Sequence, residues 1–260
     1  MVSKQFHKYL KVFEKKESER MLTKKAWDHT IDLREGFVPK KGKIYLLSRI
    51  EREEVQEFVK DQLRKRYIRP SKSPQMSLIF FVLKKDGKKR MVQDYWYLNS
   101  WTVKNNYLLP LISDLIESLG KKKVFTKINL WWGYNNVRIK KEDEWKTAFS
   151  MPEGLFELIV MFFGLTNSPV TFQMMINDLL RDLVVEEKVV VFIDDVMIVT
   201  ETEEGHNKIV EEVLRRLEEN DLFVKPEKCI WKIGKVKFLG VIIGEDRVRI
   251  EKEKVQGVIE

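Results

Sequence analysis

The sequence has 260 residues, of which 43% are hydrophobic and 34% charged, a balance typical of a globular protein that buries one or two cores. The 48 Lys and Arg residues outnumber the 40 Asp and Glu residues, and the resulting net charge of +8 favours a polyanionic partner such as nucleic acid, although it would equally serve solubility. A single cysteine excludes an internal disulfide, the scattered His residues fit no zinc spacing, and no run of 18 apolar residues is present to span a membrane.

The sequence predicts little regular secondary structure before the first clear helix. Residues 1–26 are rich in Lys and Glu with few apolar anchors, so we expect a solvated or loosely helical lead-in. From Ser48 the apolar residues follow helical spacing, and Ser48 with Glu51 forms a capping-box pattern that starts an amphipathic helix ending before Pro70. The residues expected on its buried face are Ile50, Val55, Phe58, Val59 and Leu63.

A lysine-rich hairpin follows the helix. Residues 78–83 and 90–95 predict two strands joined by a turn built on Asp86 and Gly87. Such a tip is often only a solvated turn, but Lys84, Lys85 and Arg90 also carry the charges needed to grip phosphates.

The second half of the chain predicts a sheet with an acidic hairpin. Helices are expected at 111–119, 168–183 and 205–220, and strands at 124–130, 237–243 and 248–250. Asp194 and Asp195 stand between two β-branched runs, which favours a hairpin turn that presents both carboxylates. Two adjacent carboxylates repel each other and attract a divalent cation, although most such pairs are solvated turns without chemistry. The order of elements describes an α+β fold, with helices on one face of the sheet.

Six segments resemble, in order and spacing, motifs of the polymerase core of reverse transcriptases, most closely those of gypsy-type long-terminal-repeat retrotransposons. The segments are Leu83-Lys-Lys-Asp-Gly-Lys-Lys-Arg90, Asp94-Tyr-Trp-Tyr-Leu-Asn99, Phe125-Thr-Lys-Ile-Asn129-Leu-Trp-Trp-Gly-Tyr134, Phe162-Phe-Gly-Leu-Thr-Asn-Ser-Pro169, Phe192-Ile-Asp-Asp195 and Phe238-Leu-Gly240. The resemblance runs from about Trp27 to the C-terminus and implies an RNA-directed DNA polymerase with a right-hand α+β fold and an antiparallel palm sheet.

The resemblance also implies a division of the chain. We expect a lead-in at 1–39, fingers at 40–104 and 137–167, palm at 105–136 and 168–243, and the truncated start of a thumb at 244–260. No protease, RNase H or integrase motif is present, so we expect a fragment or a shortened reading frame.

Roles for individual residues follow from the resemblance alone. Asp194, Asp195 and the residue at position 129 would hold two Mg²⁺ or Mn²⁺ ions. The other assignments are Lys84, Lys85 and Arg90 for the triphosphate, Tyr134 for sensing the sugar, Phe163 and Gly164 for lining the nucleotide pocket, Phe238, Leu239 and Gly240 for the primer grip, and Lys228 for protonating pyrophosphate. Core packing is the alternative interpretation of Tyr134, Phe163 and Phe238.

The implied partners are a primed RNA or DNA template and deoxynucleoside triphosphates, with no membrane. The implied location is the cytoplasm, including virus-like particles, or the nucleus, while the oligomeric state is left open by the sequence.

Position 129 departs from the family pattern, because Asn stands where the family places Asp. An amide offers one neutral oxygen instead of an anionic pair, so we expect impaired or absent polymerase activity, and a catalytically dead nucleic-acid-binding remnant is the alternative. A different two-metal phosphate enzyme would explain the acidic pair but not the other motifs.

Seven further positions suggest decay of a genomic copy. The family usually has Arg at the positions of Trp96 and Trp131 and Ala at the position of Val170. It usually has Pro at the positions of Leu46, Leu83, Leu108 and Leu158. Each replacement, like that at Asn129, needs one C-to-T or G-to-A codon change, which indicates a retroelement eroded by cytosine deamination. Sequencing the gene tests this hypothesis.

Overall fold

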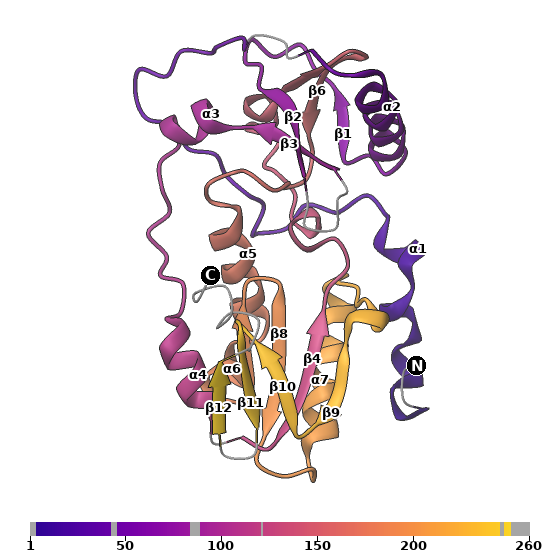
Figure 1. Cartoon of the computed structure of the whole chain (residues 1–260), viewed down its shortest axis with the longest axis vertical. Coiled ribbons are helices and arrows are strands. Elements are labelled where there is room, and N and C mark those ends of the chain that lie inside the picture. The colour runs from indigo at the N-terminus through magenta and orange to yellow at the C-terminus, as the bar shows by residue number, and fades with distance from the viewer. Residues whose placement is uncertain (1–3, 43–45, 84–88, 121, 245–246, 251–260) are drawn as a thin grey trace, which may run out of the picture. The chain divides into compact units, whose positions relative to one another are not determined.

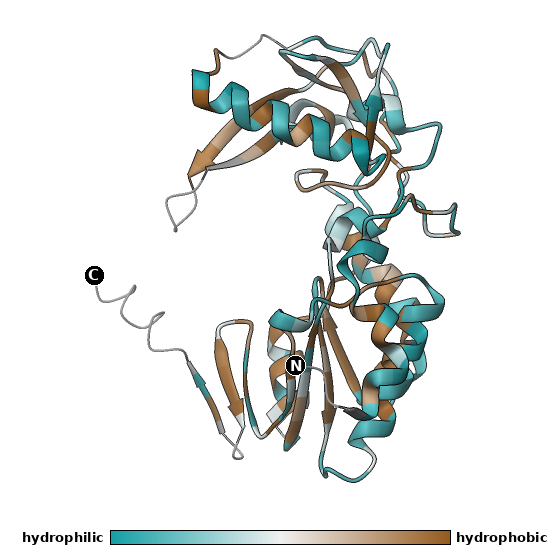
Figure 2. Ribbon diagram, turned by 90° about the vertical axis from the view of Figure 1, so that its right-hand side faces the viewer, coloured by the Kyte–Doolittle hydropathy of each residue, from teal (hydrophilic) through white to brown (hydrophobic). Residues whose placement is uncertain are grey.

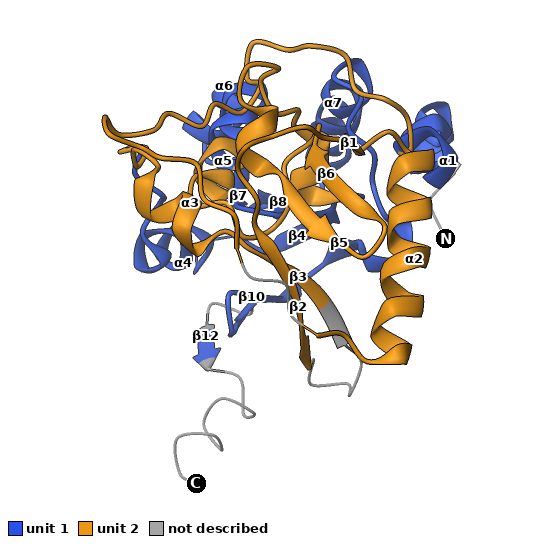
Figure 3. Cartoon of the chain, turned by 90° about the horizontal axis from the view of Figure 1, so that it is seen from above, with its two compact units in different colours: residues 1–18, 107–131, 173–260 blue, residues 19–106, 132–172 orange. Residues whose placement is uncertain are grey.

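The chain divides into two compact units, each assembled from separate stretches of sequence (Figure 3). The structure is a computed structural model that describes residues 4–42, 46–83, 89–120, 122–244 and 247–250. Unit 1 comprises Met1–Ser18, Tyr107–Trp131 and Gln173–Glu260, and unit 2 comprises Glu19–Asn106 and Trp132–Phe172. The expected boundaries at 105, 137 and 168 lie close to these, whereas the expected lead-in at 1–39 is divided between the units.

Unit 1 is built on a four-stranded antiparallel sheet with the order β7-β8-β4-β9 (Figure 1). Its strands are β4 (Val124–Asn129), β7 (Val189–Phe192), β8 (Asp195–Thr200) and β9 (Ile230–Ile233). Valine and isoleucine dominate β7 and β8, and such β-branched side chains pack well on a pleated surface.

The two faces of this sheet are covered differently. Phe125, Met197 and Val199 face a core that also contains residues of a second sheet and of helix α4 (Ile112–Gly120). The second sheet has the order β10-β11-β12, with β10 (Lys235–Phe238), β11 (Val241–Gly244) and β12 (Arg247–Ile250). Because side chains alternate along a strand, Thr126 points to the opposite face, where it contacts His206 of α7 (His206–Glu219). Figure 2 shows the hydrophobic residues gathered on the strands of the sheet.

The segment expected to be one helix at 168–183 forms two. Helix α5 covers Ser168–Leu179 and α6 covers Arg181–Val185, and Leu180 between them leaves helical geometry with φ −113 and ψ 19. Leu180 is fully buried, so packing of its side chain takes precedence over continuation of the helix.

The lead-in, expected to be solvated or loosely helical, is largely helical over residues 4–18 but packs against the rest of unit 1 instead of being solvated. Residues 4–13 form a 3-10 helix, η1 (Lys4–Phe13), followed by α1 (Lys15–Ser18). Phe6 and Val12 are buried, and the rings of Phe6 and Phe13 lie 5.6 and 6.0 Å from that of Trp231. Few apolar residues are present here, but their spacing lets them pack onto unit 1.

Unit 2 contains two small sheets. One is the predicted hairpin of β2 (Leu78–Leu83) and β3 (Lys89–Asp94), whose turn lies outside the described residues. The other has the order β1-β6-β5, with β1 (Ile68–Pro70), β5 (Phe149–Met151) and β6 (Gly154–Leu158). The remaining elements are α3 (Trp96–Trp101), η2 (Gly133–Asn136) and η3 (Glu144–Thr147) in unit 2, and η4 (Pro226–Lys228) in unit 1.

The capped helix predicted after residue 48 is confirmed as α2 (Arg49–Arg64), and Ser48 and Glu51 form a reciprocal capping box. Its buried face is narrower than expected, because Val55 and Val59 are buried whereas Ile50 is 65% exposed. Among the helices of the described ranges, none combines the length and apolar character that crossing a membrane requires.

Candidate active site

The acidic pair lies at a two-residue turn. Phe192 pairs with Asp195, so only Ile193 and Asp194 connect β7 to β8. Ile193 has a φ of 52, in the left-handed region that β-branched residues rarely adopt. Strain of this kind costs about 1–3 kcal/mol and persists only where the surroundings enforce it.

Gln173 enforces the strained turn. This fully buried residue accepts a hydrogen bond from the Ile193 N–H (2.7 Å) and donates to the Val191 carbonyl (3.1 Å) and to Oδ1 of Asn177 (3.0 Å). A carboxamide carries both a donor and an acceptor, so it can satisfy the strand and the turn together. The sequence gives no signal for this role, since nothing in the helical context of Gln173 distinguishes it from a core position.

Asn129 lies beside the acidic turn. Strands β4 and β8 pair in a register that sets Asn129 directly opposite Asp195. Residues in such a pair project from the same face of the sheet, with Cβ atoms about 5 Å apart. This is the juxtaposition that the resemblance requires.

The backbone of Asn129 is fixed by the segment that contains Lys228. The Lys225 N–H donates to the Asn129 carbonyl (2.8 Å), and the Asn129 N–H donates to Sγ of Cys229 (3.3 Å). Burial raises the pKa of the Cys229 thiol to about 11, so this group stays protonated. Lys228 itself lies exposed in η4, within this segment.

The two carboxylates of the turn have different surroundings. Burial, and next the charge of Asp195, raises the pKa of Asp194. Oδ1 of Asp194 is buried and has no hydrogen-bond partner among the described residues. Oδ2 of Asp195 instead accepts from Nζ of Lys127 at 2.8 Å. Lys127 was not expected in the site, although the two-residue period of a strand that ends at position 129 could have revealed it.

The donor set of the turn fits a divalent cation, but weakly. The buried, unpartnered oxygen of Asp194 is a group that a cation would satisfy, and Asp195 and the amide oxygen of Asn129 are hard oxygen donors next to it. Within the described ranges, no group of three or more His, Cys, Asp and Glu side chains could hold a metal ion. The site therefore offers one anionic ligand fewer than a three-carboxylate site.

The residues expected to contact a nucleotide lie in unit 2. The Tyr134 ring, on η2, lies 4.8 Å from that of Phe163 and 5.7 Å from that of Phe172. Tyr134 is only 7% exposed, whereas Phe163 is 56% exposed. Phe163 is thus available to a ligand, and Tyr134 is held by packing.

Asn99 connects two of the sequence motifs within unit 2. Its Nδ2 donates to the Gly164 carbonyl (2.6 Å), and its Oδ1 accepts from the Thr166 N–H (2.9 Å). Gly164 has a φ of 103, which a side chain rarely adopts, so glycine is required there. Asn99 thereby fixes the loop that carries Phe163.

The remaining expected residues are placed as follows. Lys84 and Lys85 lie outside the described residues, and of Arg90 the backbone is described, paired with Val82 in the β2–β3 hairpin. The Phe238 ring belongs to the core of unit 1, while Leu239 and Gly240 form the positive-φ turn between β10 and β11. A contact with a primer here would come from the turn and not from the buried ring.

Comparison with known proteins gives a consistent result. Residues 82–243 match the family model described as "Reverse transcriptase (RNA-dependent DNA polymerase)". The chain is 37% identical over 198 residues to the Transposon Tf2-3 and Tf2-7 polyproteins of Schizosaccharomyces pombe, and the match covers 76% of this chain but 15% of each polyprotein.

Solved structures show the same likeness. The foamy viral protease-reverse transcriptase in complex with an RNA/DNA hybrid is 24% identical and aligns with a TM-score of 0.85 over 99% of this chain and 34% of that chain. The same viral protein in complex with double-stranded DNA is 26% identical, with a TM-score of 0.84 over 99% of this chain and 53% of that chain.

Proposed function

Because this chain belongs to the reverse transcriptase family, we propose that it carries out template-directed DNA synthesis by two-metal nucleotidyl transfer, in a form weakened by Asn129. Its partners on this proposal are a primed RNA or DNA template and deoxynucleoside triphosphates. Unit 1 would be the palm and unit 2 the fingers of the polymerase.

Asp194, Asp195 and Asn129 are the residues that would hold Mg²⁺ or Mn²⁺. Bound divalent cations supply charge neutralisation at the phosphates and a lower pKa for the attacking 3′-hydroxyl. The chain's own contribution is to hold two carboxylates at a turn fixed by Gln173, with one buried oxygen of Asp194 that has no hydrogen-bond partner in the described part of the chain.

Asn129 weakens this arrangement. Its single neutral oxygen replaces an anionic carboxylate, so both cation affinity and charge neutralisation fall. The loss of several kcal/mol of transition-state stabilisation corresponds to about a thousandfold or more in rate.

The other roles are assigned by the resemblance. Tyr134 would exclude a ribose 2′-hydroxyl, Phe163 and Gly164 would line the pocket of the incoming nucleotide, and Lys228 would protonate the leaving pyrophosphate. The low exposure of Tyr134 (7%) and the packing of its ring against those of Phe163 and Phe172 support a gate that is fixed in position.

The observation that carries the proposal is the pairing of Asn129 with Asp195. The test is primer extension on an RNA template with Mg²⁺ or Mn²⁺, comparing the chain as it stands with Asn129→Asp. We expect the substitution to raise the extension rate by about three orders of magnitude. Asn106→Asp, which makes the same change of charge at an exposed position, should have no effect.

A nucleic-acid-binding remnant is the second candidate. At several positions that depart from the family pattern, large apolar side chains are exposed to solvent: Leu46 (95%), Leu83 (75%), Trp96 (81%) and Leu108 (87%). Mutational decay without selection for activity would leave such a surface. Failure of both proteins to extend a primer, together with tight and salt-sensitive duplex binding, would favour this candidate.

A further inference from the structure

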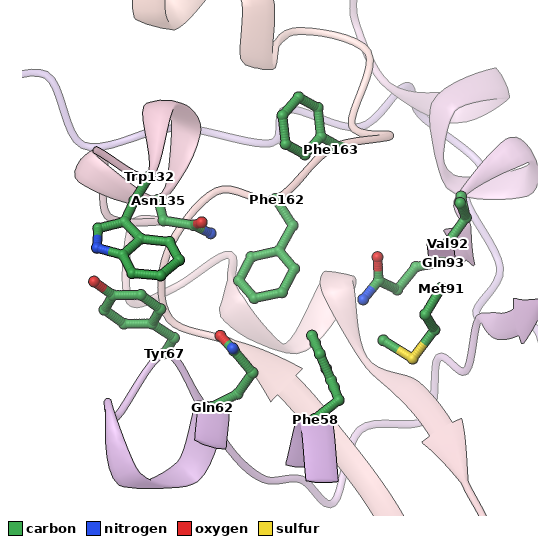
Figure 4. Close-up of a pocket in the computed structure, with 10 residues that line it drawn as sticks. All are labelled: Phe58, Gln62, Tyr67, Met91, Val92, Gln93, Trp132, Asn135, Phe162 and Phe163. Carbon is green, nitrogen blue, oxygen red and sulfur yellow. The ribbon is translucent and has the colours of Figure 1, made fainter. Parts of the chain in front are cut away.

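A pocket in unit 1 contains none of the residues assigned to catalysis or to nucleotide binding. The pocket of unit 2 that includes Phe163 (Figure 4) serves the incoming nucleotide on the proposed function. The pocket of unit 1 has a volume of about 390 Å³ and lies between strand β7, helices α4 and α6, and the segment 107–110 that precedes α4.

Strand β7 forms one edge of its sheet, in which the order is β7-β8-β4-β9. In an antiparallel pair, alternate residues direct their N–H and C=O groups towards the partner strand, and the others direct them away. The Val199 N–H donates to the Lys188 carbonyl (2.9 Å), so Lys188 and Val190 face β8. Val189 and Val191 therefore direct their backbone groups to the outer edge, and both residues line the pocket.

A side-chain amide already completes one end of this edge. The carboxamide of Gln173 donates to the Val191 carbonyl (3.1 Å) and accepts from the Ile193 N–H (2.7 Å). The remaining outward groups are the N–H and C=O of Val189 and the N–H of Val191, and among the described residues none of them has a hydrogen-bond partner. The backbone of an extended segment carries both donors and acceptors, so it could satisfy all three groups.

The walls beside this edge are mainly apolar. Leu115 of α4 and Val184 of α6 line the pocket, and next to it Leu111 is 65% and Val185 77% exposed. A cavity of about 150 Å³ holds benzene, so a volume of about 390 Å³ accommodates two apolar side chains. An extended segment supplies such side chains at every second residue.

The charged residues that line the pocket are both acidic. Asp114 and Glu187 are exposed, and neither forms an ion pair with a described residue. They contrast with the net charge of +8 of the whole chain and favour a segment that carries basic residues. The same charges oppose a symmetric dimer through this edge, because such a contact would bring the acidic residues of two copies together.

We propose that β7 binds an extended segment of another protein, apolar with basic ends, which adds a fifth strand to the sheet at its outer edge. Hydrogen bonds to the backbone of Val189 and Val191 hold the segment, while the apolar walls and the two acidic residues select its side chains.

A synthetic peptide binding to the full chain tests the proposal. The probe is a fluorescent heptapeptide in which three valines alternate with two threonines, between a lysine at each end. Fluorescence anisotropy in EDTA, without nucleotide, makes the measurement independent of polymerase activity. We expect saturable binding, and a peptide with glutamate at both ends should bind about fivefold more weakly, although the net charge of the chain would attract it.

A charge reversal locates the peptide on the protein. Glu187→Lys should weaken binding of the lysine-ended peptide about fivefold. Glu153→Lys is the matched control, because Glu153 is an exposed residue outside the pocket and the change of net charge is the same. This control should bind the peptide like the unmodified chain.

Backbone methylation of the peptide distinguishes strand addition from apolar contact alone. In an added strand the N–H groups of the valines and those of the threonines point to opposite edges. N-methylation of one set should therefore weaken binding about tenfold, whereas N-methylation of the other set should have little effect.

Four results would overturn the proposal. They are the absence of saturable binding, equal affinities of Glu187→Lys and Glu153→Lys, equal effects of the two methylated peptides, and a dimer in sedimentation velocity that the lysine-ended peptide dissociates. The last result would identify a second copy of the chain as the occupant of the edge.

Discussion

Nζ of Lys127 lies 2.8 Å from Oδ2 of Asp195, on the strand face that also carries Asn129. The two side chains are 18% and 25% exposed, so the pair is partly shielded from water. An ammonium in this position competes with any cation for the carboxylate. Asn129 provides no anionic ligand where the family has a carboxylate, and Lys127 neutralises the charge of Asp195.

Removing this ammonium should strengthen cation binding. We expect Lys127→Met to lower the Mn²⁺ concentration for half-saturation about fivefold, the equivalent of about 1 kcal/mol. Mn²⁺ titration followed by electron paramagnetic resonance measures the change. Lys122→Met is the control, since Lys122 pairs with Glu201 and not with the acidic turn. Unchanged Mn²⁺ affinity in Lys127→Met would show that the ion pair does not compete.

The hydrogen bonds of Gln173 to Ile193 and Val191, which fix the acidic turn, should be important for stability. Gln173→Met keeps a side chain of similar size but leaves the Ile193 N–H and the Val191 carbonyl without their partner, which should cost about 2–3 kcal/mol of unfolding free energy. Urea denaturation measures this cost. Gln56→Met, at an exposed glutamine, should change stability by less than about 0.5 kcal/mol. Equal stabilities of the two variants would show that the hydrogen bonds of Gln173 do not stabilise the turn.

Two glycines should respond differently to the same substitution. Gly164→Ala forces a side chain into a φ of 103 and should lower the unfolding free energy by about 1–3 kcal/mol. Gly120→Ala lies at the end of α4, where the added methyl group meets no described atom within 4 Å apart from its chain neighbours and the backbone of its own helix. This substitution should be neutral or raise the unfolding free energy by up to about 1 kcal/mol. Thermal denaturation of both variants measures the difference, and an equal loss of stability in both would contradict the prediction.

Acid should destabilise the protein through two buried histidines. Burial lowers the pKa of His29, and burial followed by the charge of Lys232 lowers that of His206, each to about 4 from an ordinary value of 6.5. Between pH 6.5 and 4 the unfolded chain therefore binds protons that the folded chain does not. Stability from these groups is complete above pH 6.5 and is lost as the pH falls towards 4, by on the order of 1–3 kcal/mol per histidine.

Substitution separates these histidines from the carboxylates that titrate nearby. His206→Gln should flatten the dependence of unfolding free energy on pH between 7 and 5, whereas His7→Gln, at an exposed position, should leave the slope unchanged. A slope that is the same in both variants would exclude His206 as a source of the acid sensitivity.

Local patterns in the sequence predicted most elements of the fold. The capping box of Ser48 and Glu51 determined the start of α2, and the β-branched runs around Asp194 predicted β7 and β8. These signals act between near neighbours and so can be read without knowledge of the fold. The family motifs identified position 129, and the sheet register then set it opposite Asp195.

Features that depend on contacts between residues far apart in the sequence could not be predicted from local patterns. The packing of Phe6 and Phe13 on Trp231 involves residues more than 200 positions apart, and helical periodicity gives no indication of it. The hydrogen bonds of Gln173 likewise depend on how α5 lies against β7. The break at Leu180 arises from burial in the tertiary structure, which a single helical pattern cannot reveal.

The only cysteine of the chain, Cys229, gives a chemical reporter at the strand that carries Asn129. Its Sγ accepts a hydrogen bond from the Asn129 N–H and donates one to the Lys225 carbonyl, and burial raises the pKa of the thiol to about 11, so we expect slow alkylation while these contacts are in place. A faster rate of alkylation would report loosening of these contacts around Asn129, without a label having to be introduced. Ligands that tighten these contacts would be detected as protection of one thiol.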